Sequence, residues 1–156
     1  MSVAIFDIDG VVADVRHRTH YLDRWPPDWG RFFDEAHRDP LLEQGHALVH
    51  AASKEHDIVW LTGRPEWLRL LTEDWFDEHD LPQAELIMRQ MDDFRPAPYV
   101  KVEALRALAP RGIASFVDDD PLVIAAAGRA GVRGTLATWV RRDAGFAQAQ
   151  DEAGRT

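Results

Sequence analysis

The feature that most constrains the fold of this chain is a regular alternation between short apolar runs and longer stretches with helical periodicity. The apolar runs, rich in β-branched residues, lie at 3–6, 58–61, 86–88, 113–117 and 135–140. The helical stretches lie at roughly 41–55, 65–79, 99–109 and 121–130. Strands that alternate with helices form right-handed βαβ units, in which a parallel sheet is covered by helices on both faces. We therefore expect a three-layer α/β/α fold around a mainly parallel five-stranded sheet.

Two segments depart from this alternation. Residues 14–40 are polar and interrupted, and they contain the run Trp25-Pro26-Pro27-Asp28-Trp29, so we expect a small helical insertion after the first strand. The end of the chain, 143–156, is rich in Ala, Gln and Gly, and we expect it to be frayed. With 156 residues in total, the sequence predicts one domain over 1–142.

Composition excludes several classes of function. The chain has no cysteine, so it cannot use a thiolate nucleophile or a cysteine zinc site. The net charge of −9 argues against a protein that grips an extended nucleic-acid backbone, which requires surplus Lys and Arg. We see neither a secretory signal nor an apolar run of the roughly 18 residues that a membrane span needs. The default expectation is a cytoplasmic protein, and the sequence does not indicate its oligomeric state.

Polar residues whose side chains could take part in catalysis or binding lie at strand ends and helix starts. They are Asp7 and Asp9 after the first strand, Thr62, Gly63 and Arg64 after the second, Lys101 near a helix start, and Asp118 and Asp119 after the fourth strand. In a parallel sheet, the carboxyl ends of the strands meet at one edge, where open α/β sheets bind ligands. The sequence therefore predicts a pocket with several carboxylates, a hydroxyl, an ammonium and a guanidinium.

This set of groups suits phosphoryl chemistry. Mg²⁺ prefers oxygen ligands and is commonly held by one or two carboxylates together with substrate phosphate, which Asp7 and Asp118 could provide. A carboxylate can attack phosphorus and form an aspartyl-phosphate, and a second carboxylate two residues on can act as acid and base. Thr62 and Lys101 could hold the phosphate oxygens.

The ordered motifs resemble those of the haloacid dehalogenase-like (HAD) phosphohydrolase superfamily. The match comprises Asp-x-Asp-Gly at 7–10, Leu-Thr-Gly-Arg at 61–64, Lys101, and the Asp pair at 118–119. This resemblance covers about residues 3–140 and implies a Rossmann-like core with the insertion as a minimal cap. It also implies that Asp7 is the nucleophile, that Asp9 is the acid and base and binds Mg²⁺ through its backbone carbonyl, and that Asp118 is a metal ligand.

Finer detail is similar to the phosphatase domain of phage-type polynucleotide kinase. This similarity rests on Arg64-Pro65, Met88-Arg89, Asp93, Arg95 and Lys101, and it makes Arg64, Arg89 and Arg95 candidates for substrate binding. The chain has no G-x-x-x-x-G-K motif, so at most the phosphatase half is present. Val11 stands where many superfamily members have Thr, which we interpret as a tolerated variant.

Other conspicuous residues have plainer interpretations. His17 and His20, and His46 and His50, have the spacing of metal ligands on a helix, but no third ligand stands out in the sequence. Trp67 and Trp75 fall in a helical stripe and are expected in or near the core. Trp25 and Trp29 could cover the pocket or stack on a base, although burial within the insertion is the favoured interpretation.

The sequence thus predicts a Mg²⁺-dependent phosphomonoester hydrolase. Its expected substrate is a nucleotide or a nucleic-acid terminal phosphate, without extended nucleic-acid binding and without a membrane. One alternative is a phosphatase of an unrelated small phosphometabolite. Another is a non-catalytic module that binds phosphate on the same fold.

Overall fold

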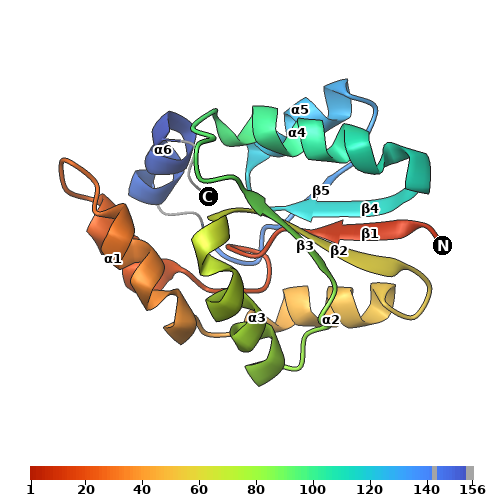
Figure 1. Cartoon of the computed structure of the whole chain (residues 1–156), viewed down its shortest axis with the longest axis horizontal. Helices are drawn as coiled ribbons and strands as arrows, with labels where there is room; N and C mark the ends of the chain where they lie inside the picture. The colour runs from red at the N-terminus through yellow and green to blue at the C-terminus, as the bar shows by residue number, and fades with distance from the viewer. Residues whose placement is uncertain (142–143, 154–156) are drawn as a thin grey trace.

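The computed structural model describes residues 1–141 and 144–153, with side chains through residue 149, and it confirms the three-layer α/β architecture (Figure 1). Five parallel strands form one sheet in the order β3-β2-β1-β4-β5. The strands are β1 (Val3–Phe6), β2 (Asp57–Pro65), β3 (Glu85–Arg89), β4 (Ile113–Asp118) and β5 (Thr135–Leu136). The order places β1 at the centre, so the residues that follow it are flanked by the ends of β2 and β4.

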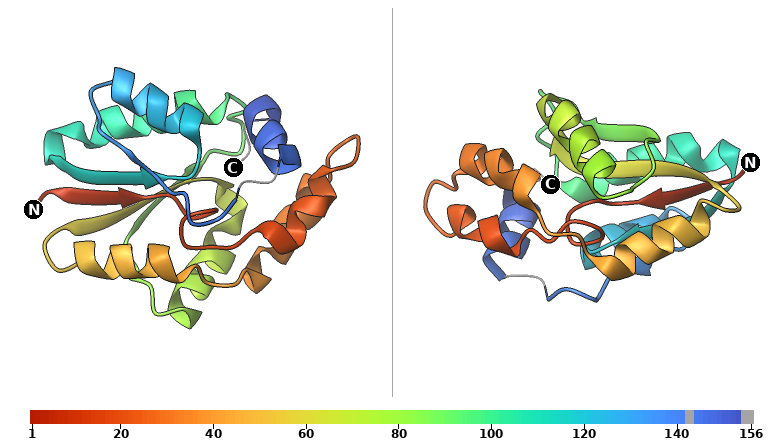
Figure 2. Two further views of the ribbon diagram at one scale, coloured as in Figure 1. Left: turned by 180° about the vertical axis from the view of Figure 1, so that it is seen from behind. Right: turned by 90° about the horizontal axis from the view of Figure 1, so that it is seen from below.

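Helices cover both faces of the sheet, as Figure 2 shows. One face carries α2 (Glu43–Ala52) and α3 (Arg69–Glu78), and the other carries α4 (Ala97–Leu108) and α5 (Pro121–Arg129). The alternation of side chains along β1 explains the two cores, because Ala4 and Phe6 join the core under α2 and α3 while Val3 and Ile5 join the other. Buried on both faces, β1 is continuously apolar, as expected for a central parallel strand.

The segment between β1 and α2 lies beyond the carboxyl ends of the strands (Figure 1). It contains the 3-10 helix η1 (Arg16–Leu22), the short helix α1 (Trp29–Asp34) and the 3-10 helix η2 (Glu35–Arg38). An antiparallel bridge between Ala13 and Leu41 brings its two ends together. The segment therefore leaves the sheet and returns to it at the edge where the motif residues lie.

Three boundaries differ from the sequence-based expectation. Pro65 remains extended as the last residue of β2, and a 3-10 turn, η3 (Glu66–Leu68), precedes α3. β5 ends at Leu136 rather than near residue 140. Beyond it, the Trp139 indole N–H donates to the Val11 carbonyl at 3.0 Å, so the chain turns toward the β1 loop.

The expected frayed tail is largely helical. Helix α6 (Ala144–Ala153) places Phe146 against Phe32 of the insertion, with 5.7 Å between ring centroids. Phe146 is only 2% exposed, so burial of one aromatic ring anchors a segment whose Ala, Gln and Glu residues already favour a helix. Residues 142–143 and 154–156 lie outside the described part of the chain.

Within the described residues, none of the helices combines the length and the apolar character that crossing a membrane requires. The cytoplasmic location remains a prediction.

Candidate active site

The structure brings Asp7, Thr62 and Asp118 to one edge of the sheet, as their positions after neighbouring strands predict. Asp7 directly follows β1, and its backbone N–H donates to the Val117 carbonyl of β4 at 2.9 Å. Asp118 is the last residue of β4, and Thr62 lies in β2 on the other side of β1. All three side chains are almost completely buried.

Lys101 joins this edge from α4. Its Nζ lies 3.0 Å from Asp7 Oδ2 and 2.6 Å from Asp118 Oδ2, so one ammonium bridges two carboxylates. A second oxygen of each carboxylate accepts a backbone N–H: Ile8 N–H donates to Asp7 Oδ1 and Asp120 N–H donates to Asp118 Oδ1. These bonds fix the orientation of both carboxyl groups.

Burial shifts the protonation equilibrium of Asp7. Desolvation is the largest cause and raises the pKa of Asp7 to about 8; the Lys101 ammonium acts in the opposite direction, while Asp118 and Asp9 add to the rise. Burial disfavours the charged form of Lys101 too, but attraction to Asp118 and Asp7 outweighs it and raises the pKa of Lys101. The ammonium is therefore held charged, whereas the nucleophile candidate carries more negative charge around it than one lysine balances.

Asp119 completes what we call the carboxylate cluster, which comprises Asp7, Asp118, Asp119 and Lys101. One oxygen each of Asp7, Asp118 and Asp119 lies within 4.8 Å of the others. Gly10 lies against Asp119 with φ of +77°, and a Cβ there would collide with the Asp119 carboxylate. Three converging buried carboxylates form a donor set that fits Mg²⁺, because the ion takes hard oxygen ligands.

Asp9 lies in a second group of charges next to this cluster. Its Oδ1 accepts from Arg64 Nη2 at 2.6 Å and from Arg18 Nη2 at 3.1 Å. The same two guanidinium groups bind Asp39: Arg18 through Nε and Nη2, both at 2.8 Å, and Arg64 through Nη2 at 3.1 Å. We call this set, Asp9, Asp39, Arg18 and Arg64, the arginine network.

The sequence did not identify Arg18 and Asp39 as site residues. Both lie in the insertion, are buried, and belong to no motif. Arg18 also donates to the Phe32 carbonyl and lies over the Phe32 ring, 4.1 Å from its centroid. A single arginine nine residues after Asp9 carries no periodic or motif signal, so only the folded insertion shows that it reaches the Asp-x-Asp-Gly loop.

The remaining predicted site residues fall in four environments. Gly63 and Thr62 are buried in β2, with the Arg64 N–H donating to Thr62 Oγ1 at 3.1 Å. Arg64 is fully buried, and besides the network it donates to Thr72 Oγ1. Arg89 is buried and donates through Nη1 to the carbonyls of Asp93 and Arg95. Arg95 is exposed and pairs with Asp93 and Glu103, so it does not reach the carboxylate cluster through these contacts.

The histidine pair at 46 and 50 gains a third potential ligand that the sequence did not reveal. Asp80, at the turn after α3, offers an oxygen within 4.8 Å of both imidazoles. His50 Nε2 already bonds to the Asp80 backbone carbonyl at 2.7 Å, and the Asp80 side chain is 94% exposed. His17, from the other pair, bonds to Asp39 at 2.6 Å and thus belongs to the surroundings of the arginine network.

Comparisons with known proteins agree with this geometry. The family model for the polynucleotide kinase PNKP phosphatase domain matches residues 1–135. A chain from the Pnkp1/Rnl/Hen1 complex superposes with a TM-score of 0.71 at 19% identity, covering 86% of this chain and 45% of that chain. This protein therefore spans less than half the length of that relative. The search of curated proteins returned no match.

Two further solved structures share the fold over most of their length. A haloacid dehalogenase-like hydrolase from Streptococcus pneumoniae has a TM-score of 0.61 at 16% identity, covering 97% of this chain and 92% of that one. The D,D-heptose 1,7-bisphosphate phosphatase from B. bronchiseptica, complexed with magnesium and phosphate, has a TM-score of 0.53 at 17% identity, with 87% and 80% covered. Since the family model covers most of the chain, this protein belongs to the PNKP phosphatase domain family of HAD phosphatases.

Proposed function

We propose that this protein hydrolyses phosphomonoesters through a covalent aspartyl-phosphate on Asp7, with Mg²⁺ as cofactor. The observation that carries the proposal is the buried carboxylate cluster, in which one ammonium faces three carboxylates at the carboxyl edge of the sheet. Such a cluster is costly to bury unless cations complete it. A cofactor cation held by Asp7, Asp118 and the Asp9 carbonyl, with Asp119 in support, would do so.

In the first step, an Asp7 oxygen forms a bond to phosphorus and the bond from phosphorus to the leaving oxygen breaks. Asp9, which has taken up a proton before this step, donates that proton to the leaving oxygen. In the second step, water attacks the aspartyl-phosphate, Asp9 takes the water proton, and Asp7 is released with inorganic phosphate. Mg²⁺, when bound, supplies positive charge that lowers the repulsion between the carboxylate and the phosphate.

The other site residues orient and stabilise the substrate phosphate and the reacting carboxyl groups. Thr62 and Gly63 lie in β2, next to the strand that Asp7 follows, and in this proposal they receive phosphate oxygens, while Lys101 neutralises charge on Asp7 and Asp118. Arg64, proposed from the sequence to contact phosphate, also acts as a positioning residue here, because with Arg18 it fixes the Asp9 carboxyl group. Arg89 and Arg95 remain candidates for contacts to the rest of the substrate.

The proposed substrate is a nucleotide or the terminal phosphate of a nucleic acid. Two observations support this choice: the family of the matched model is a polynucleotide kinase phosphatase domain, and among the described residues the sheet edge carries the small insertion and α6 rather than a large cap domain. Bulky ends can approach a site without a large cap. The net charge of −9 still argues against binding along an extended backbone.

The direct test is phosphate release in Mg²⁺ over a substrate panel. It should contain nucleoside monophosphates, 3′- and 5′-phosphorylated oligonucleotides and sugar phosphates, with Asp7→Asn as the matched control. Preference for the nucleotide substrates supports the proposal. Preference for a sugar phosphate indicates a phosphatase of small metabolites, and a single burst of phosphate without turnover indicates a phosphate-binding module.

A further inference from the structure

A hollow of about 340 Å³ opens at the carboxyl ends of β2 and β3, beside the insertion. Aromatic and sulfur-containing side chains from three separate segments line it: Trp29 and Phe33 from α1, Trp67 from η3, and Met91 and Phe94 from the loop after β3. The polar groups on its wall are few and include Arg89, Gln90 and Asp93. A mostly apolar hollow with a few polar groups has the composition of a small-molecule site.

The apolar groups at this hollow are unusually exposed. Trp67 is 50% exposed, Met91 58% and Phe94 65%, although large apolar side chains gain free energy from burial. We predicted Trp67 in or near the core from its helical stripe, and the structure shows that this prediction was wrong, whereas Trp75 is buried as expected. Exposed apolar groups that gather in one place mark interaction sites.

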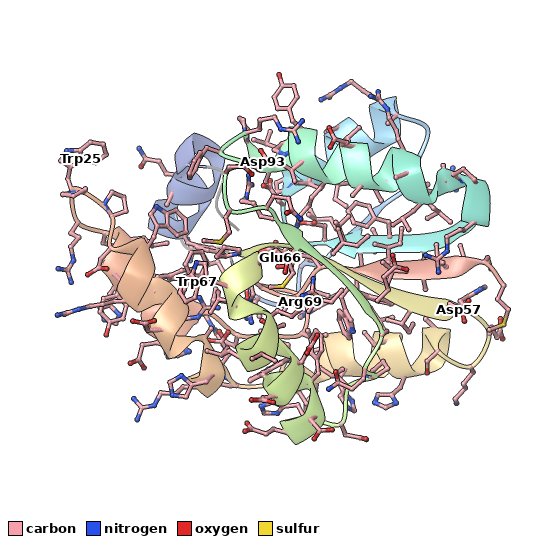
Figure 3. All side chains as sticks on the ribbon, in the orientation of Figure 1. Trp25, Asp57, Glu66, Trp67, Arg69 and Asp93 are labelled. Atoms are coloured by element: carbon pink, nitrogen blue, oxygen red, sulfur yellow. The ribbon has the colours of Figure 1, made fainter. Side chains whose placement is uncertain are left out.

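The Trp67 ring has a rigid support. It meets the Phe33 ring edge-on at 5.9 Å, and Phe33 stacks on buried Trp29 at 5.6 Å. Figure 3 shows Trp67 near α1, whereas Trp25 lies at the far tip of the loop before α1. The ring is thus held in place before any ligand arrives, which lowers the entropy lost on binding.

The hollow lies at the same sheet edge as the carboxylate cluster. Pro65, on its wall, comes three residues after Thr62 and pairs with Arg89 across β2 and β3. Asp7 follows Phe6, whose partner in β2 is Trp60, whereas Pro65 and its partner Arg89 lie farther along their strands. The hollow is therefore one to two strand spacings across the sheet and two to four residues beyond Asp7 along it, roughly 8–16 Å away. One nucleotide with its phosphate at Asp7 can span the near part of this range.

We propose that this aromatic hollow binds a single nucleobase, that of the nucleotide whose terminal phosphate is held at Asp7. The proposal rests on the proposed function and specifies its substrate: the base stacks on Trp67, with Phe94 and Met91 around it and Gln90 at its polar edge. Stacking on an aromatic ring tolerates any base, since every base has a π face. The volume, near the lower limit for ligand pockets, suits one base rather than a strand.

The lining argues against other occupants. A sugar phosphate needs many hydrogen-bond partners, and the hollow is lined mainly by rings and Met91. A nucleic-acid backbone needs a row of cations, and among the residues that the structure describes, Arg89 is the one cationic residue on the wall. The Asp93 carboxylate is paired with Arg95 at 2.8 Å, so it does not make the hollow a cation site.

The test measures kcat/KM for a phosphorylated terminal nucleotide and for the same end with an abasic residue, in the full chain with Mg²⁺. Trp67→Ala should lower the value for the base-bearing end by about 5- to 150-fold, the range expected for one stacked base. It should leave the abasic end within about twofold, and Trp67→Phe should restore part of the loss. Trp25→Ala, an exposed tryptophan outside the hollow, should change neither value.

Each other outcome is decisive. Equal losses on both ends, or no loss on either, would overturn the base-binding proposal while leaving hydrolysis at Asp7 intact. A gain of about a hundredfold or more on lengthening the strand past one nucleotide would also overturn it. If no ester is turned over, the proposed function fails, and calorimetric binding of AMP to Asp7→Asn decides the hollow separately: binding that Trp67→Ala weakens supports the proposal, and no binding refutes it.

Discussion

Two groups of buried charge meet at the carboxyl edge of the sheet, and they differ in how well their charges are balanced. In the arginine network, two guanidinium groups face two carboxylates, and each guanidinium touches both carboxylates. In the carboxylate cluster, one ammonium faces three carboxylates. The first group is complete with the protein's own residues, and the second is short of positive charge.

Because of this difference in charge balance, the two groups suit different roles. The arginine network joins the insertion, through Arg18 and Asp39, to the core residues Asp9 and Arg64. It can therefore position a reacting group and hold the insertion without any ligand. The carboxylate cluster reaches balance only with added cations, and that is the property expected of a site for a metal and a phosphoryl group.

The largest expected effect comes from removing the nucleophile of the carboxylate cluster. Asp7→Asn should lower kcat by at least about a thousandfold, because an amide cannot form the acyl-phosphate. The protein should still fold, since Asn is neutral and has nearly the same shape as the Asp7 side chain. Phosphate release and circular dichroism on the same sample check both statements. Measurable turnover above a trace in Asp7→Asn would mean that another group attacks phosphorus.

The second-largest effect should come from removing the metal, which distinguishes the carboxylate cluster from the arginine network. A chelator should abolish activity and Mg²⁺ should restore it, while Ca²⁺ should bind without supporting comparable turnover. Ca²⁺ takes more ligands at longer distances than the octahedral Mg²⁺ and favours bidentate carboxylates, which would occupy the Asp7 oxygen needed for attack. Full activity in the chelator, or with Ca²⁺ alone, would contradict the proposed cofactor.

Removing one member of the arginine network should destabilise the fold irrespective of metal. Arg18→Leu leaves Asp39 and Asp9 short of a buried partner, and we expect a loss of about 3–5 kcal/mol in the free energy of unfolding. The matched control is Arg16→Leu, whose Arg16–Asp14 pair is largely exposed on the arginine side, so its loss should change stability far less. Urea titrations with and without Mg²⁺ provide the measurement. Equal small losses for both variants would show that the network is dispensable.

Much of the fold and of the carboxylate cluster could be predicted from the sequence, because the signals lie within short stretches of the chain. Buried parallel strands are continuous apolar runs, and the residue that follows such a strand necessarily lies at the carboxyl edge. Asp7 and Asp118 follow Phe6 and Val117 in this way, so two short stretches of sequence suffice to bring them together. Asp120, two residues after Asp118, is the N-cap of α5 and accepts the Leu122 N–H, which is also a local interaction.

The arginine network could not be predicted, because it depends on contacts that no local pattern encodes. Arg18 and Asp39 are 21 residues apart and meet only when the insertion folds back over the Asp-x-Asp-Gly loop. Trp67 shows the converse failure: its helical spacing suggested a core position, but the 3-10 turn before α3 rotates it out of the stripe. Helix α6 depends on a similar long-range contact, between Phe146 and Phe32.

The smallest expected effect is a pH dependence that belongs to the carboxylate cluster alone. In chelator, the pKa of Asp7 is about 8 in the folded protein against an ordinary value of 3.8, so the folded state holds a proton that the unfolded state loses. Stability from this group is full below about pH 4 and is lost as pH rises toward 8. Asp7→Asn does not titrate at this position, so its melting temperature should gain on that of the wild type as pH rises from 5 to 8. Asp93 has the opposite shift: the Arg95 hydrogen bond lowers the pKa of Asp93 to about 2, so its contribution is constant over this range. Asp93→Asn should therefore differ from the wild type by the same amount at pH 5 and at pH 8.

Excess Mg²⁺ should flatten the Asp7 trend, because a bound cation favours the carboxylate at every pH. A gap between Asp7→Asn and wild type that is as flat in chelator as in Mg²⁺ would show that the carboxylate cluster is already balanced, and the contrast with the arginine network would be lost.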